Sequence, residues 1–173
     1  MLSLILMLMM STEKLVLVDF NEGSGTKWVN VDDVVIGGES QSKFTTDASG
    51  KGVFYGVVSL ENNGGFSSIK HSFDPINISK FKKAFIRIKG DGKRYQFRVK
   101  SSLDERVSYK TYFLTTGKWE TIEIDLLTME PTWRGWTPDL PKYPANTIAE
   151  VGFLIANKKA ERFELKFEKI WLE

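Results

Sequence analysis

The sequence predicts an all-β protein, a two-sheet antiparallel β-sandwich of the jelly-roll kind. Hydrophobicity alternates with a period of two along most of the chain, and turn residues separate the alternating runs at short intervals. No segment repeats apolar residues at helical spacing over three turns. The aromatic content of 13% agrees with this reading, because aromatic side chains favour pleated sheets. The 173 residues suffice for one domain and leave little room for two.

The clearest alternation lies in the middle of the chain. Apolar residues alternate with polar ones over 84–89 and again over 94–100, and the turn residues 90–93 separate the two runs. We predict that the two runs pair as a β-hairpin with one face in the core. The polar face of this hairpin, either a solvated surface or a ligand face, would carry Arg87, Lys89, Arg94, Arg98 and Lys100.

Similar alternation and turn signals predict the remaining strands. These strands are expected over residues 15–20, 42–46, 53–60, 66–73, 107–113, 119–126, 151–155 and 163–167. Short helical turns are expected over 79–83 and 125–129. The segment 130–146 is predicted to be irregular, because it holds four of the five prolines. A loop of this length in a compact domain usually has a function.

The first ten residues are almost all apolar. They are too few to span a bilayer, which takes about 20 residues, and they lack the basic region and cleavage site of a secretory signal. We expect residues 1–13 to be a disordered or mis-started segment, with Met10 as an alternative start, and residues 14–173 to form the single sandwich domain. A cytoplasmic location is expected, unless residues 1–10 act as a targeting segment for the membrane or for export.

Composition narrows the function. The chain has no cysteine, which excludes disulfides and thiolate chemistry. The net charge of +2 is near balance, so no nucleic-acid partner is expected. The single histidine, His71, lies in a predicted strand and is interpreted as a residue that hydrogen-bonds to a neighbour. Neither a phosphate-binding glycine loop nor a nucleophile elbow is present. The sequence therefore predicts no catalytic residue, no cofactor and no metal site.

Carboxylates offer the one alternative to this non-catalytic interpretation. Asp32 and Asp33 are adjacent, with Glu39 nearby, and a glycoside hydrolase uses two carboxyl groups. Neighbouring residues of a strand point to opposite faces, so we expect an exposed Asp32 and a turn-forming Asp33. A structural calcium ion held by loop oxygens also stays open at this point.

Five stretches of the sequence together resemble the complex I intermediate-associated protein 30 family. They are WVNVDDVVIGGES (28–40), with Ile36 where the family usually has Met, FYGVVSLENNGGF (54–66), GDGKRY (90–95), PTWRG (131–135) and GFLIANK (152–158). The resemblance implies a fold similar to galactose-binding-like carbohydrate-binding modules. It also implies a link to assembly factors that bind intermediates of respiratory complex I. This chain resembles the short, stand-alone form of the family.

The same resemblance suggests structural roles for the motif residues. The glycines of the motifs are expected to supply backbone geometry that other residues forbid. The polar motif residues are expected to pin loops through side-chain-to-backbone hydrogen bonds. The structural motif comprises Asp33, Gly37, Gly38, Ser40, Asn63, Gly64 and Gly65, with Asn62 beside them.

A binding site is predicted from loop aromatics and cations. Trp133, Arg134 and Trp136 lie in the proline-rich segment, and tryptophan and arginine are the residue types that anchor interfaces. Together with Asn62 and Arg98, these three residues form the predicted binding site. We expect a protein-interaction or complex-assembly domain, and the alternative is a carbohydrate or small-ligand binding module. The expected partner is a protein, with a glycan or small ligand as the alternative, and membrane contact is expected only through that partner.

Overall fold

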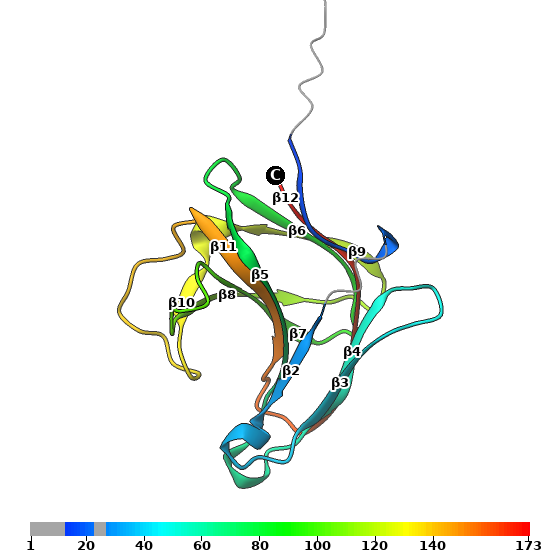
Figure 1. Cartoon of the computed structure of the whole chain (residues 1–173). Coiled ribbons are helices and arrows are strands. Elements are labelled where there is room, and N and C mark those ends of the chain that lie inside the picture. Colours follow the sequence, from blue (N-terminus) through cyan, green and yellow to red (C-terminus); the bar gives the residue numbers. More distant parts are fainter. Residues whose placement is uncertain (1–12, 23–26) are drawn as a thin grey trace, which may run out of the picture.

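The computed structural model describes residues 13–22 and 27–173. Expectations for residues 1–12 and for the turn at 23–25 lie outside the described residues. The described chain forms two antiparallel sheets packed face to face, as the sequence predicted (Figure 1). Four short 3-10 helices join the strands, namely η1 (Phe20–Glu22), η2 (Asp33–Ile36), η3 (Glu61–Asn63) and η4 (Leu126–Thr128).

The first sheet, here called the β12 sheet, is built around the long C-terminal strand. One edge of β12 pairs with β4 and then β1, and the other edge pairs with β6. The strand order is β3-β4-β12-β6-β9, with β1 paired to β12. Its strands are β1 (Leu15–Asp19), β3 (Gln41–Thr46), β4 (Gly52–Val58), β6 (Lys83–Lys89), β9 (Trp119–Asp125) and β12 (Glu161–Leu172).

The second sheet, here called the β7 sheet, has the order β10-β8-β7-β11-β5-β2. Figure 1 shows β5 and β11 curving toward the β12 sheet, so the outer face of the β7 sheet is concave. Its strands are β2 (Val29–Asp32), β5 (Ser67–Asn77), β7 (Arg94–Lys100), β8 (Ser108–Leu114), β10 (Glu130–Thr132) and β11 (Thr147–Ile155).

Aromatic side chains fill the space between the sheets. Phe153 of β11 lies fully inside, with its ring centroid 5.0 Å from Phe167 of β12 and 5.8 Å from Phe97 of β7. Trp28 adds a further ring 6.1 Å from Phe153. Because Phe153 contacts rings from both sheets, it joins the two layers into one core.

The predicted hairpin over 84–100 is wrong. Strand β6 belongs to the β12 sheet and β7 to the β7 sheet, so the two runs face each other across the core. The intervening loop is pinned for this crossing, because the Asp91 carboxylate accepts hydrogen bonds from Tyr95 Oη (2.9 Å) and from the Glu164 amide (3.0 Å). Alternation shows that one face of each strand is buried, whether the two strands are paired in one sheet or lie in opposite sheets. It therefore does not distinguish a hairpin from a connection between the sheets.

The predicted polar face divides for the same reason. Arg87 and Lys89 lie on β6, while Arg94, Arg98 and Lys100 lie on β7, in the other sheet. The cations therefore belong to two different surfaces.

Other boundaries also differ from the prediction. Strands β2 and β10 were not expected, and β10 lies inside the segment predicted to be irregular. Both are short edge strands that pair with longer partners, β5 and β8, and so carry little periodicity of their own. No helix forms over 79–83, although η4 does form within the turn expected over 125–129.

The ring cluster generates a stability prediction. We expect Phe153→Ala to lower the free energy of unfolding by about 3–5 kcal/mol, because it removes a buried ring shared by both sheets. Urea unfolding followed by tryptophan fluorescence measures this loss. Leu114→Ala, at a side chain that is 66% exposed, is the control and should change stability by no more than about 0.5 kcal/mol. Equal effects of the two substitutions would contradict the packing described here.

Candidate functional site

A buried carboxylate joins two loops at one end of the sandwich. Asp33, the first residue of η2, is fully buried. One carboxylate oxygen accepts a hydrogen bond from the Ser40 amide (2.8 Å), and the other accepts from Ser40 Oγ (2.5 Å). That second oxygen also accepts from the amides of Gly65 (2.6 Å) and Phe66 (3.2 Å). Asp33 therefore holds the β2–β3 loop against the loop that follows β4.

Two glycines make room for this carboxylate. A Cβ atom at Gly38 would lie 2.3 Å from Asp33 Oδ1, and one at Gly64 would lie 2.6 Å from Asp33 Oδ2. Any larger residue would collide with the carboxylate or displace it. Ser40 Oγ extends the network by accepting a hydrogen bond from the Ser59 amide at 2.9 Å. The two glycine-rich motifs of the sequence are thus two halves of one structural unit.

The hydrogen bonds determine the charge state of Asp33. Burial acts to raise the pKa of this carboxyl, but the hydrogen bonds from Ser40, Gly65 and Phe66 outweigh burial and hold the pKa below its ordinary value of 3.8. Asp33 is therefore ionised at neutral pH, with its charge balanced by hydrogen-bond donors.

The braced loops present apolar side chains to solvent. Val34, Val35 and Ile36 of η2 are 60%, 71% and 64% exposed, and Leu60 is 46% exposed. Figure 1 shows η2 and η3 together at one end of the sandwich, and the hydrogen bonds of Asp33 confirm that the loops touch. We call these four residues the apolar tip. The sequence analysis missed it, although three apolar residues between Asp33 and Gly37 were a visible signal.

Asn62 and Asn63 belong to this same end of the molecule. Both adopt left-handed backbone conformations, with φ of 54° and 60°. The Asn62 side chain donates a hydrogen bond to Glu39 Oε1 at 3.1 Å. Asn62 therefore lies beside the apolar tip, whereas the other predicted site residues lie on the β7 sheet or at its edge.

Trp133 and Trp136 form a small hairpin after β10. Their backbones pair in both directions (3.0 and 3.1 Å), and their rings meet edge to face with centroids 6.0 Å apart. Arg134 and Gly135 occupy the turn with φ of 47° and 88°, the geometry of a two-residue turn in which both residues are left-handed. The Arg134 guanidinium lies 5.2 Å from the Trp133 ring, and Trp136 is 52% exposed.

Arg98 lies in the middle of the concave outer face of the β7 sheet. It pairs in register with Lys110 of β8, which in turn faces Glu130 of β10. From two strand spacings and three residues of strand, Trp133 is roughly 14 Å away from Arg98. The structure thus brings Trp133, Arg134 and Trp136 together, and it places Arg98 on the same sheet but apart from them.

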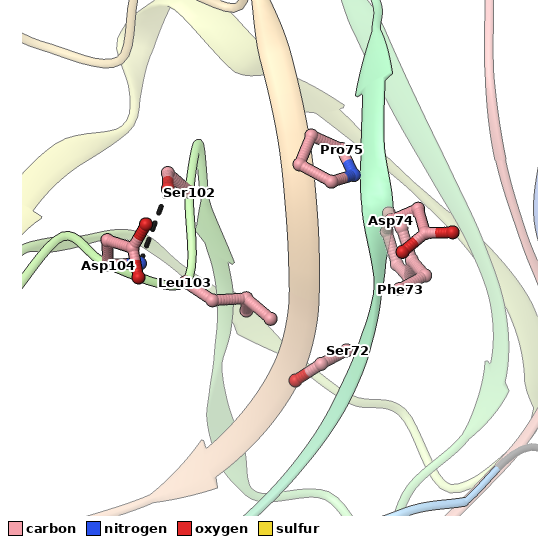
Figure 2. A pocket seen from close by; sticks show the side chains of 7 residues that line it. All are labelled: Ser72, Phe73, Asp74, Pro75, Ser102, Leu103 and Asp104. Carbon is pink, nitrogen blue, oxygen red and sulfur yellow. Dashed lines mark hydrogen bonds between the residues drawn. The ribbon is translucent and has the colours of Figure 1, made fainter.

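A pocket of about 450 Å³ lies at one end of the β7 sheet. Figure 2 shows β5 residues on one side and the β7–β8 loop on the other, with Leu103 reaching across between them. The Ser102 hydroxyl caps this loop by accepting a hydrogen bond from the Asp104 amide at 3.3 Å. The pocket contains one aromatic residue, Phe73, and two carboxylates, Asp74 and Asp104. Its lining residues are Ser72, Phe73, Asp74, Pro75, Ser102, Leu103 and Asp104.

The described residues assemble neither a nucleophile–histidine–carboxylate arrangement nor a cluster of metal ligands. His71 Nδ1 lies 3.2 Å from the Lys27 carbonyl oxygen, and Ser72 Oγ instead donates to Glu150. Asp32 was expected to be exposed, but it is partly buried and accepts hydrogen bonds from the amide and hydroxyl of Ser42 (2.8 and 2.5 Å). Within residues 13–22 and 27–173, no helix is long and apolar enough to cross a membrane.

The model of the complex I intermediate-associated protein 30 (CIA30) family matches residues 18–167, and the chain belongs to this family. The matched region covers both glycine-rich motifs and the Asp33 network. A search of curated protein sequences gives no match.

The fold resembles those of carbohydrate-binding modules. The family 11 module of the cellulosomal cellulase Lic26A-Cel5E of Clostridium thermocellum superposes with a TM-score of 0.67 at 18% identity, covering 94% of this chain and 95% of that one. The same family's module in complex with a β-1,3-1,4-mixed-linked tetrasaccharide gives 0.63 at 18%, covering 92% and 94%. A family 30 module gives 0.57 at 14%, covering 93% and 98%. At these identities the likeness shows a shared β-sandwich fold.

The Asp33 network predicts a pH-dependent loss of stability. Asp33→Asn should lower the free energy of unfolding at pH 7 by about 3 kcal/mol, because the amide leaves buried donors without an acceptor. A carboxyl whose pKa is lower in the folded state than in the unfolded state stabilises the fold at pH values above its unfolded-state pKa. This stabilisation is lost as the pH falls through the folded-state pKa. The difference in free energy of unfolding between wild type and Asp33→Asn should therefore become smaller as the pH falls below about 4.

Urea unfolding at a series of pH values measures this gap. Asp19 and Asp47, whose pKa values are also lowered, titrate in both proteins and cancel in the difference. Asp139→Asn, at an exposed loop residue, is the control and should leave stability within about 0.5 kcal/mol of wild type. A gap that stays constant from neutral to acid pH would contradict the account.

Proposed function

We propose that this protein is a non-catalytic protein-interaction domain of the assembly-factor type, and that it binds its partner through the apolar tip. The observation that carries the proposal is the exposure of Val34, Val35 and Ile36 on a short helix whose base is fixed by Asp33. Exposed apolar groups on a rigid support are typical of interaction sites.

Energetics support a binding role for the tip. Burying a Val, Leu or Ile side chain fully contributes roughly 1.5–3 kcal/mol, so four of them supply a substantial part of a binding free energy. The support matters as well, because a loop that is already fixed loses little conformational entropy on binding.

The charge of the tip favours a protein partner over a lipid surface. The ionisable residues of segments 33–40 and 59–66 are Asp33, Glu39 and Glu61, and neither segment contains lysine or arginine. An anionic membrane attracts basic segments, and the two loops that form the tip contain no basic residue; Lys158 and Lys159 at the same end belong to the separate β11–β12 turn. A protein with an apolar recess suits the tip better.

Membership of the CIA30 family supports a finer proposal. The partner would be a subunit or assembly intermediate of a respiratory complex, as the family description suggests. The domain itself would be cytoplasmic and would meet the membrane only through that partner.

Affinity capture tests this function. The tagged full chain is expressed in its native cells as wild type, Ile36→Asp and Leu114→Asp, and retained proteins are quantified by mass spectrometry. Ile36 and Leu114 are 64% and 66% exposed, so the two substitutions place the same charge at equally accessible positions. We expect respiratory-complex subunits with wild type and Leu114→Asp, and at least a tenfold lower yield of them with Ile36→Asp.

Two results would count against the proposal. Retention of the same subunits by Ile36→Asp would remove the apolar tip from the interface. Enrichment of no protein by wild type would remove the protein-interaction function itself.

A second function, glycan binding, is favoured by one specific feature. The outer face of the β7 sheet is concave (Figure 1). The exposed Trp136 belongs to the small hairpin that follows β10, the edge strand of this sheet. A concave polar face beside an exposed aromatic ring suits a saccharide, whose apolar ring faces pack on aromatic side chains.

A glycan array separates this function from the first. Retention of any glycan should fall about tenfold in Trp136→Ala, because the stacking surface is lost. Tyr55→Ala removes an aromatic ring that is 39% exposed on the other sheet, and it should leave retention unchanged. Equal retention by wild type and Trp136→Ala would exclude the hairpin from glycan binding.

A further inference from the structure

Two cations lie side by side on the concave face without a carboxylate partner. Arg98 and Lys110 are directly opposite in the β7–β8 register, which places two basic residues next to each other on one face of the sheet. Lys110 is only 9% exposed and Arg98 is partly buried. Among the described residues, no carboxylate lies within ion-pair distance of either cation, and Glu130, opposite Lys110, makes no ion pair with it.

The Arg98 guanidinium is positioned but only partly engaged. Gln96, which is 5% exposed, accepts hydrogen bonds from Arg98 Nε (2.9 Å) and Nη2 (2.8 Å). A guanidinium has five N–H donors, so the Nη1 group and one Nη2 hydrogen remain for another acceptor. This remaining edge has the fork geometry that binds a carboxylate through two parallel hydrogen bonds.

Burial makes the unpaired charges costly. Burial acts to lower the pKa of Arg98 below its ordinary value. Lys110 Nζ lies 5.6 Å from the Tyr112 ring, and the Arg94 guanidinium lies 4.7 Å from the same ring. Cations thus occupy the surroundings of Tyr112, so the centre of this face is suited to charge and hydrogen bonding more than to stacking of a neutral sugar.

The position of the pair indicates what kind of ligand reaches it. Strand β7 lies between β8 and β11 in the interior of the sheet, where neighbouring strands use the backbone hydrogen-bonding groups. Peptides commonly bind a sheet by adding a strand at its edge, and no edge is available at Arg98. At Arg98 a ligand therefore meets side chains and no free backbone groups, and Gly152, opposite Arg98 on β11, adds no side chain to the floor.

We propose that the outer face of the β7 sheet binds an acidic saccharide, and that Arg98 and Lys110 together hold its carboxylate. This inference rests on the second function proposed above and names the ligand class. Gln96 is a positioning residue, since it orients the Arg98 fork without facing the ligand carboxylate itself.

Isothermal titration of the full chain with the trimer of galacturonic acid, and with the neutral galactose trimer, tests the proposal. We expect binding of the acidic trimer that weakens with added salt, and no measurable binding of the neutral trimer. Arg98→Gln and Lys110→Gln should each weaken binding roughly 10- to 100-fold. Arg87→Gln, which removes a matched cation from the other sheet, should have no effect.

Before titration, the thermal unfolding midpoint of each variant is compared with that of wild type. If Arg98→Gln does not fold, the conclusion is drawn from Lys110→Gln. Equal binding of both trimers would keep glycan binding and overturn the carboxylate site. Unchanged affinity of Arg98→Gln and Lys110→Gln for the acidic trimer would also overturn the carboxylate site. If a polyglutamate peptide binds and the acidic trimer does not, the saccharide proposal is overturned. If neither trimer binds, both the acidic-saccharide proposal and the proposed glycan-binding function are overturned.

Discussion

The ionised carboxylate of Asp33 is the constraint on which one end of this molecule depends. It is fully buried, and donors from Ser40, Gly65 and Phe66 surround it. Two chain segments separated by about 25 residues of sequence must converge for these donors to meet it, which couples the β2–β3 loop to the loop between β4 and β5. The apolar tip is exposed because this network holds the ends of η2 in place.

The two proposed binding surfaces use different physical chemistry. The apolar tip offers hydrophobic area on a fixed support, which suits a protein partner and depends little on salt. The outer face of the β7 sheet offers unpaired cations on a concave floor, which suits an anionic ligand and depends strongly on salt. Because the two surfaces occupy different parts of the sandwich, a substitution in one surface tests one proposal without altering the other surface.

Alternation in the sequence predicted the fold class and most strands, because period-two burial depends only on local residues. It did not predict which sheet each strand joins, and the 84–100 segment shows why: the Glu164 amide that donates a hydrogen bond to Asp91 lies 73 residues further along the chain. The motif glycines pointed to close backbone approach, but the sequence did not reveal that Asp33 is the group approached. The pairing of Arg98 with Lys110 was likewise hidden, since it depends on the β7–β8 register.

The central claim is that the Asp33 network makes the tip a preformed element and not a loose pair of loops. Amide hydrogen exchange of the free protein tests this most directly. The account predicts that the amides of Ser40 and Gly65 exchange nearly as slowly as that of Ile69 in β5, because buried hydrogen bonds to a carboxylate open only with the fold. Exchange at Ser40 and Gly65 as fast as in the exposed loop 103–106 would contradict it.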